Sequence, residues 1–138
     1  MTQKIRVVFD TNIWISFLIT NKLKLYDLLF SPHLEVLFSK ELIDEFSDVV
    51  SRRKFRKYFT PRLANIFIER IIENGQAISL KSQVDICRDK SDNYLLSICK
   101  DGNAGFLVTG DANLQVIGTY QETTIISPSE FFNQLKKS

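Results

Sequence analysis

Short apolar runs alternate along this chain with segments that have the periodicity of amphipathic helices. The run from Ile5 to Phe9 is rich in β-branched residues, which is typical of a strand covered on both faces. Strands that alternate with helices form right-handed βαβ units. The sequence therefore predicts an α/β fold, a three-layer α/β/α sandwich with a mostly parallel central sheet, and one domain over residues 1–138.

Polar residues and turn dipeptides set the expected boundaries of these elements. Ser39 and Thr60 are natural N-caps, and Pro61 suits the first turn of a helix. Strands are expected at residues 5–9, 34–38, 77–80, 106–109 and 124–126. Helices are expected at residues 13–18, 23–30, 40–53, 61–74, 89–101, 111–116 and 128–135.

Composition excludes several classes of protein. A net charge of +2 is too small to indicate nucleic-acid binding by itself, and no apolar run reaches the roughly 18 residues of a membrane span. The N-terminus lacks the pattern of a secretory signal, so a cytoplasmic protein without membrane contact is expected. Cys87 and Cys99 lack metal-finger spacing and are expected to be buried. His33 is the single histidine, so zinc hydrolase and Ser-His-Asp chemistry lack their usual parts.

Two acids follow predicted strands. Asp10 comes directly after the run at 5–9, and Asp111 comes after Gly110 at the end of the run at 106–109. In parallel sheets, ligands bind beyond the carboxyl ends of the strands. Asp10 and Asp111 are therefore expected at the ligand-binding edge.

Two further acids lie beside the apolar sides of predicted helices. At about 100° per residue, Glu45 is about 60° from Leu42, and Asp92 is about 60° from Leu95. Acids in such places are costly unless a cation or hydrogen bonds compensate them. Carboxylates alone favour Mg²⁺ or Mn²⁺.

Each acid also has an ordinary structural explanation. Asp10 and Asp111 could cap the helices that follow them. Glu45 could pair with a lysine, and Asp92 could be favoured by the dipole at the start of its helix. A single cation site explains all four acids together.

Four blocks of the sequence resemble the signature blocks of PIN-domain ribonucleases. They are VVFDTNIWIS, SKELIDEFSDVV, DKSDNYLLSICK and FLVTGDANL, and the resemblance extends from about Arg6 to the terminal Ser-Pro-Ser-Glu-Phe-Phe segment. Within that family, the chain is most similar to the bacterial VapC-like toxins of toxin–antitoxin systems. The resemblance implies RNA as substrate, an antitoxin protein as partner, and a homodimer.

The resemblance also implies roles for individual residues. Asp10, Glu45, Asp92 and Asp111 would be the catalytic acids that bind one or two Mg²⁺ or Mn²⁺ ions. At Asn113 many relatives carry a further aspartate, which predicts a weaker or absent second metal position here. The residues expected to support the acids are Thr11, Asn12, Asp89, Thr109 and Asn113.

This chemistry suits the residues independently of the resemblance. An acidic site accepts a phosphodiester only if cations screen the repulsion, and Mg²⁺ also activates a water. No side-chain nucleophile is needed. We therefore expect hydrolysis of single-stranded RNA, and the resemblance implies 5′-phosphate and 3′-hydroxyl ends.

A basic, aromatic segment follows the helix at 40–53. Its aromatic residues are Phe55, Tyr58 and Phe59. Basic groups can follow phosphates while aromatic faces stack on bases. The alternative is a cationic helix end favoured by the macrodipole, with the aromatics packed inward. The basic residues are Arg52, Arg53, Lys54, Arg56 and Lys57.

Two other functions fit part of the pattern. A phosphoaspartate phosphatase usually has a second acid two residues after its nucleophile, where this chain has Asn12. A non-catalytic RNA-binding or dimerisation module of the same fold would have no reason to keep a repulsive cluster of acids.

Overall fold

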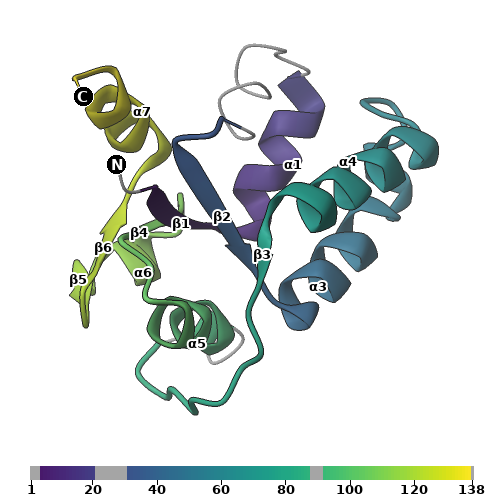
Figure 1. Cartoon of the computed structure of the whole chain (residues 1–138). Helices are drawn as coiled ribbons and strands as arrows, with labels where there is room; N and C mark the ends of the chain where they lie inside the picture. Colours follow the sequence, from purple (N-terminus) through teal and green to yellow (C-terminus); the bar gives the residue numbers. More distant parts are fainter. Residues whose placement is uncertain (1–3, 21–30, 88–91, 138) are drawn as a thin grey trace.

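A six-stranded sheet forms the centre of the computed structural model, which describes residues 4–20, 31–87 and 92–137 (Figure 1). The strand order is β3-β2-β1-β4-β6-β5, and every neighbouring pair is parallel except β5 and β6. The mostly parallel sheet predicted from the sequence is therefore confirmed. The strands are β1 (Ile5–Phe9), β2 (Leu34–Phe38), β3 (Gln76–Ala77), β4 (Phe106–Val108), β5 (Thr119–Tyr120) and β6 (Thr123–Ile126).

Helices connect most of the strands. Ser39 Oγ accepts a hydrogen bond from the Leu42 N–H (3.2 Å), and Thr60 Oγ1 accepts one from the Leu63 N–H (3.1 Å), so both predicted N-caps are confirmed. The helix expected at 23–30 lies outside the described residues. The helices are α1 (Thr11–Thr20), α3 (Lys40–Val50), α4 (Pro61–Asn74), α5 (Asn93–Gly102), α6 (Ala112–Gln115), α7 (Pro128–Lys137) and the 3₁₀ turn η1 (Arg53–Phe55).

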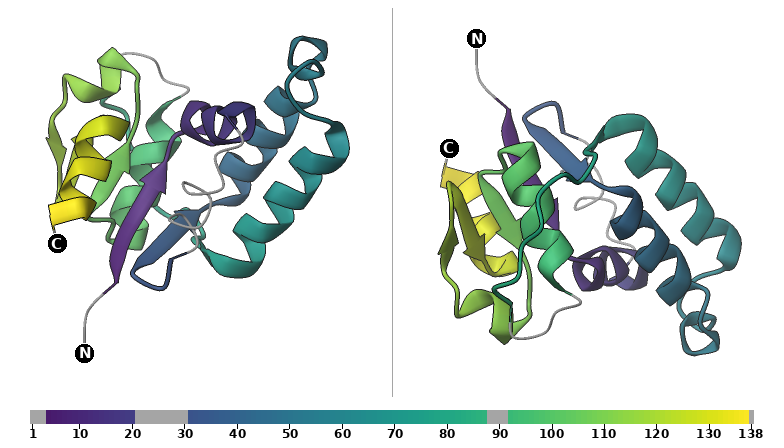
Figure 2. Two further views of the ribbon diagram at one scale, coloured as in Figure 1. Left: turned by 90° about the horizontal axis from the view of Figure 1, so that it is seen from above. Right: turned by 90° about the horizontal axis from the view of Figure 1, so that it is seen from below.

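Helices cover both faces of the sheet, which gives the predicted three layers. Residues 6 and 9 of β1 point to opposite faces, because side chains alternate along a strand. The Phe9 ring lies edge-on against Trp14 of α1 and Phe131 of α7, whereas Arg6 Nε donates to the Gly102 carbonyl of α5 (2.8 Å). Figure 1 accordingly shows α1 and α7 on one side of the sheet and α5 on the other. In Figure 2, the α3–α4 hairpin extends beyond the β2–β3 side of the sheet.

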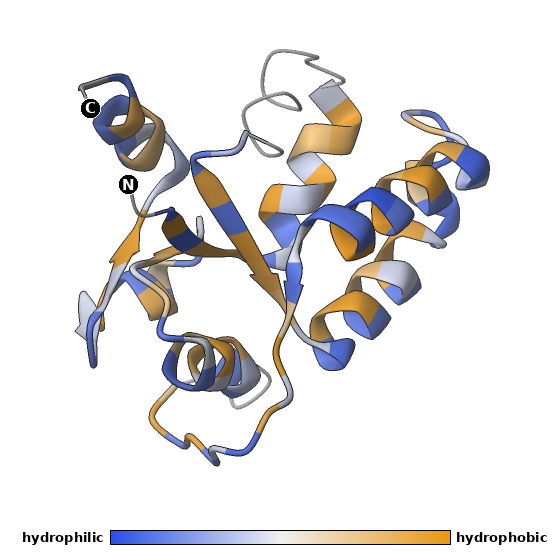
Figure 3. Ribbon diagram, viewed as in Figure 1, coloured by the Kyte–Doolittle hydropathy of each residue, from blue (hydrophilic) through white to orange (hydrophobic). Residues whose placement is uncertain are grey.

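The core is built from aromatic and aliphatic side chains that meet under the helices. Phe9 has no exposed surface, and Trp14 and Phe17 of α1 are buried against its ring. Both cysteines are buried, as expected. The hydropathy colouring in Figure 3 shows apolar sides of α3 and α4 facing each other, with polar residues outside. None of the helices in the described ranges is long and apolar enough to cross a membrane.

Candidate active site

Asp10 lies buried where β1 passes into α1. Its backbone N–H donates to the Val108 carbonyl of the neighbouring strand (3.0 Å), which holds the residue at the carboxyl end of the sheet. Its Oδ2 accepts a hydrogen bond from the Thr109 hydroxyl (2.7 Å). The sheet edge therefore positions Asp10 as expected from the sequence.

Thr109 connects Asp10 with Asp111. While its hydroxyl donates to Asp10, its oxygen accepts a hydrogen bond from the Asp111 N–H (3.0 Å). The Thr109 carbonyl accepts from Gln115 Nε2 (2.8 Å), which ties the segment to α6. Asp111 also caps α6, because its Oδ1 accepts from the Asn113 N–H (2.8 Å). Asn113 thus acts on this acid through its backbone, and capping occupies one carboxylate oxygen of Asp111.

Glu45 reaches the site from α3. Its Oε2 accepts hydrogen bonds from the Thr11 hydroxyl (3.1 Å) and from the Tyr94 hydroxyl of α5. The Glu45 side chain is nevertheless exposed, so it lies further outside the apolar side of α3 than its helix phase indicates. Thr11 therefore contacts this acid directly. Tyr94 was not anticipated, because it contacts Glu45 only through the tertiary fold.

Asp92 and Asp89 occupy the start of the α5 region. Asp92 is half-buried at the N-cap position of α5, and its side chain makes no capping hydrogen bond. The capping role expected for Asp89 lies outside the described residues. Within the described ranges, no three Asp, Glu, His or Cys side chains are grouped closely enough to hold a metal ion. The fold brings Asp10, Asp111 and Glu45 to the carboxyl edge of the sheet, but their side chains are not as close together as the ligands of a bound metal ion.

The order of the acids agrees with a family comparison. A model described as "PIN domain" matches residues 6–113, a range that includes all four predicted acids. The chain belongs to the PIN domain family. An uncharacterized protein of Methanocaldococcus jannaschii is 30% identical over 116 residues, covering 80% of this chain and 74% of that relative. A solved structure of VapBC2 from Rickettsia felis, bound to a DNA fragment from its promoter, matches with a TM-score of 0.59. It covers 89% of this chain and 98% of the matched chain at 14% identity, and shares the fold.

The surroundings of Asp10 in this PIN domain disfavour its negative charge. Burial raises the pKa of Asp10, and the charges of Glu45 and Asp111 raise it further. The hydrogen bonds from the Thr109 hydroxyl and the Asn12 N–H lower the pKa but do not cancel the rise. Glu45 and Asp111 are therefore each close enough to Asp10 to disfavour its charge. Asn12 contributes to this balance through its backbone.

Neutral donors surround these acids in the described part of the chain. Burial and the neighbouring Glu45 charge raise the pKa of Tyr94, so its hydroxyl stays protonated and donates. The three ion pairs found between described residues involve none of Asp10, Glu45 and Asp111. A divalent cation prefers oxygen ligands and would supply positive charge that offsets the repulsion between the carboxylates. The chemistry of these side chains therefore fits such an ion.

Replacing Thr109 with Val should show what the bridging hydroxyl contributes. Thr109 is buried, and a hydrogen bond to a charged group contributes about 1.5–3 kcal/mol. We expect Thr109→Val to lower the free energy of unfolding by about that amount. Nuclease activity should fall by about tenfold or more, because the Asp10 carboxylate loses the group that fixes it, and about 1.4 kcal/mol of transition-state stabilisation corresponds to tenfold in rate. Thr109→Ser retains the hydroxyl and should keep most of the activity. Equal losses of activity in the two variants, measured alongside urea unfolding, would contradict the role of the hydroxyl.

Proposed function

We propose that this PIN domain is a metal-dependent endoribonuclease that hydrolyses phosphodiester bonds of single-stranded RNA in the cytoplasm, with residues 1–138 as one nuclease domain. One observation carries the proposal. Buried Asp10 repels Glu45 and Asp111, which come from distant parts of the chain to the carboxyl edge of the sheet. PIN domains are generally nucleases, and this cluster has the composition that such chemistry needs.

Asp10, Glu45, Asp92 and Asp111 would hold one or two Mg²⁺ or Mn²⁺ ions. When bound, the ions neutralise charge on the phosphate and lower the pKa of a water. The protein's own groups keep the carboxylates in place. Thr109 fixes the Asp10 carboxylate relative to the Asp111 backbone. Thr11 and Tyr94 hold one oxygen of Glu45.

Removal of the metal is the direct test. Single-stranded RNA should remain intact with the protein in EDTA, and Mg²⁺ or Mn²⁺ should restore cleavage to fragments with 5′-phosphate ends. A phosphatase would instead release inorganic phosphate from small phosphoesters, and a non-catalytic module would bind RNA without yielding products. Cleavage at an equal rate in EDTA would contradict the proposal.

We further propose that this nuclease is a homodimeric toxin held inactive by an antitoxin protein. The support is the resemblance of its sequence blocks to VapC-like toxins and the fold that it shares with a chain of VapBC2. Expression of the chain alone should stop growth, and co-expression of a small protein encoded beside it should restore growth. Growth that is unaffected by the active nuclease would remove the toxin role and leave the chemistry intact.

A further inference from the structure

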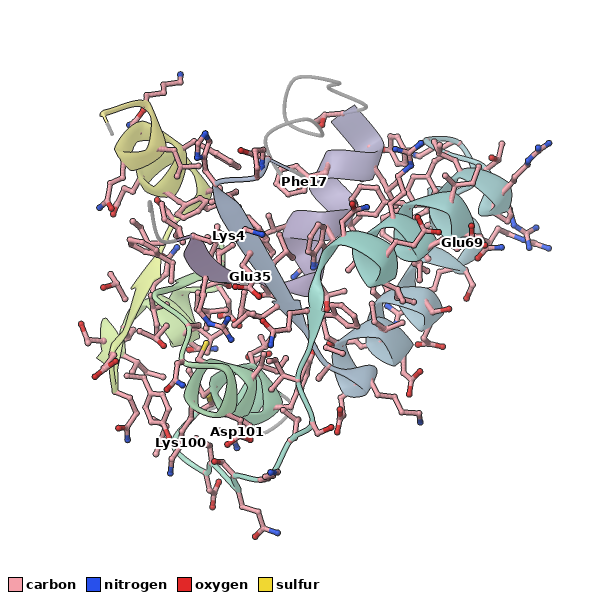
Figure 4. The ribbon with its side chains drawn as sticks, in the orientation of Figure 1. Lys4, Phe17, Glu35, Glu69, Lys100 and Asp101 are labelled. Carbon is pink, nitrogen blue, oxygen red and sulfur yellow. The ribbon has the colours of Figure 1, made fainter. Side chains whose placement is uncertain are left out.

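Positive charge is concentrated at the turn between α3 and α4. Residues 48–62 contain six basic side chains and one acid, whereas the whole chain has a net charge of +2, so the rest of the chain is net negative. Figure 4 shows nitrogen-tipped side chains projecting from this end of the hairpin. We call residues 52–58 the basic tip. Its five cations are all exposed: Arg52, Arg53, Lys54, Arg56 and Lys57.

The backbone of the basic tip is held by local hydrogen bonds and by two aromatic rings. The Tyr58 and Phe59 N–H groups both donate to the Phe55 carbonyl (2.9 and 3.2 Å). Phe59 is buried, and the Phe55 ring stacks on it with centroids 5.8 Å apart and planes 14° apart. These two aromatics therefore pack inward, as the alternative interpretation of the segment expected. Their packing fixes the turn that displays the cations.

Tyr58 differs from the other two aromatics. Its side chain is 49% exposed, and the Lys57 ammonium lies 5.1 Å from its ring centroid. An exposed aromatic ring beside cations can stack on an unpaired base while the cations contact the adjoining phosphates. The basic tip thus presents both kinds of group that single-stranded RNA requires.

Neither the helix macrodipole nor ion pairing explains the cations. Helix α3 ends at Val50 and has no basic residue in its last turn, whereas the effect of the macrodipole falls off within that turn. Arg52 forms an exposed pair with Asp48 at 3.6 Å. No ion pair of the other four cations is found within the described ranges. Four of the five cations are thus available to a partner.

We propose that the basic tip binds single-stranded RNA beside the bond that is cleaved, with cations on its phosphates and Tyr58 stacked on one base. The site of cleavage rests on the proposed nuclease function, whereas the binding does not. Glu45 lies five residues before the end of α3 at Val50, about 7.5 Å along the helix at 1.5 Å per residue, and the basic tip begins two residues beyond that end. At a stacked spacing of about 3.4 Å, the tip therefore begins about two to three nucleotides from Glu45. The tip therefore contacts nucleotides that flank the reacting phosphate.

Binding should be measured without cleavage, in the Asp10→Asn background and in EDTA. The probe is a fluorescent single-stranded RNA of about 12 nucleotides, a length within known site sizes. We expect the double variant Arg53→Glu/Lys57→Glu to bind at least about tenfold more weakly. The slope of the logarithm of the binding constant against the logarithm of the salt concentration should also become shallower by about 1.4. Two phosphate contacts are lost, and each contributes about 0.7 to this slope on a single strand. Tyr58→Ala should weaken binding to single-stranded RNA and leave binding to duplex RNA unchanged.

The matched control is Lys81→Glu/Lys100→Glu, which makes the same change in net charge at two exposed lysines. Lys100 lies on α5, away from the hairpin (Figure 4). This control should keep the affinity of the parent. An equal loss in the control would show that only net charge matters and would overturn the proposal. Unchanged RNA affinity in the tip variants, with loss of binding to polyglutamate, would instead assign the tip to an acidic protein.

Cleavage kinetics distinguish this proposal from the proposed function. In the protein with Asp10 intact, the tip variants should raise KM for the long RNA while kcat stays unchanged. If the tip variants lose RNA affinity but the parent never cleaves, the binding surface stands and the nuclease function falls. If the parent cleaves and the tip variants show an unchanged KM, the nuclease stands and the binding surface is overturned.

Discussion

Replacing Asp10 with Asn is expected to lower metal-dependent RNA cleavage by about a hundredfold to a thousandfold. A bound cation supplies several kcal/mol of transition-state stabilisation, and each 1.36 kcal/mol is worth tenfold in rate. Asn keeps the shape of the side chain and removes the charge that would hold the cation. Single-turnover cleavage measured over a range of Mg²⁺ concentrations should show the loss, together with weaker binding of Mn²⁺ in calorimetry.

The same substitution should stabilise the metal-free protein. The pKa of Asp10 is raised in the fold. The folded state therefore binds more protons than the unfolded state at pH values between the ordinary pKa of an aspartate and the raised one. The free energy of unfolding therefore falls as the pH rises from the ordinary pKa of an aspartate to the raised one, and the loss persists above it. In EDTA at neutral pH, Asp10→Asn should unfold at a higher temperature than the parent. The difference should vanish in acid, and Mg²⁺ should protect the parent more than the variant.

Asp44→Asn is the control for this experiment. Asp44 is an exposed acid on α3 that pairs with Lys40 at 3.3 Å. Its substitution should leave cleavage and stability close to those of the parent, because exposed pairs contribute about 0–1 kcal/mol. An Asp10→Asn variant that cleaves RNA normally would remove Asp10 from the chemistry. A variant less stable than the parent in EDTA would show that the Asp10 carboxylate serves mainly as a structural acid.

Replacing Phe9 with Ala is expected to lower the free energy of unfolding by about 3–5 kcal/mol, the usual cost of truncating a large buried side chain. Phe9 has no exposed surface, and its ring meets Trp14, Phe17 and Phe131 edge-on. A loss of this size is a large part of the 5–15 kcal/mol typical of a whole domain. Urea unfolding should show a lower midpoint with an unchanged slope.

Val116 offers the corresponding control. It is 81% exposed, so Val116→Ala should change stability by less than about 0.5 kcal/mol. If Phe9→Ala costs no more than this control, the aromatic cluster does not hold α1 and α7 on the sheet. Activity should also fall in Phe9→Ala, because Phe9 immediately precedes Asp10.

Much of the fold could be predicted because burial leaves a local pattern in the sequence. The runs that form β1 and β4 are apolar over most of their length, which is how strands covered on both faces appear. Several predicted boundaries differ from the structure. Among them, the strand predicted at 77–80 is Gln76–Ala77, and the helix predicted at 40–53 ends at Val50. Strand β5 was missed, since two residues carry no periodicity. Its pairing with β6 depends on a turn in which Gln121 adopts a φ of 55°.

The positions of two candidate site residues could be predicted because position along a strand fixes position in space. Asp10 and Asp111 follow paired strands, so the sheet carries them to the same edge. Helix phase placed Glu45 near the site but could not reveal that it stays exposed. Tyr94, which donates to Glu45 across 49 positions of the chain, left no local signal. Contacts of this kind depend on how α3 and α5 pack, which no window of sequence contains.

The hydrogen bond from Thr109 to Asp10 joins residues 99 positions apart. The two residues meet only after β1 has paired with β4, which is synthesised much later. A growing chain that has not yet emerged as far as β4 therefore has not assembled the proposed catalytic site. If the protein cleaves RNA as proposed, a new copy cannot do so until β4 has been made and has paired with β1.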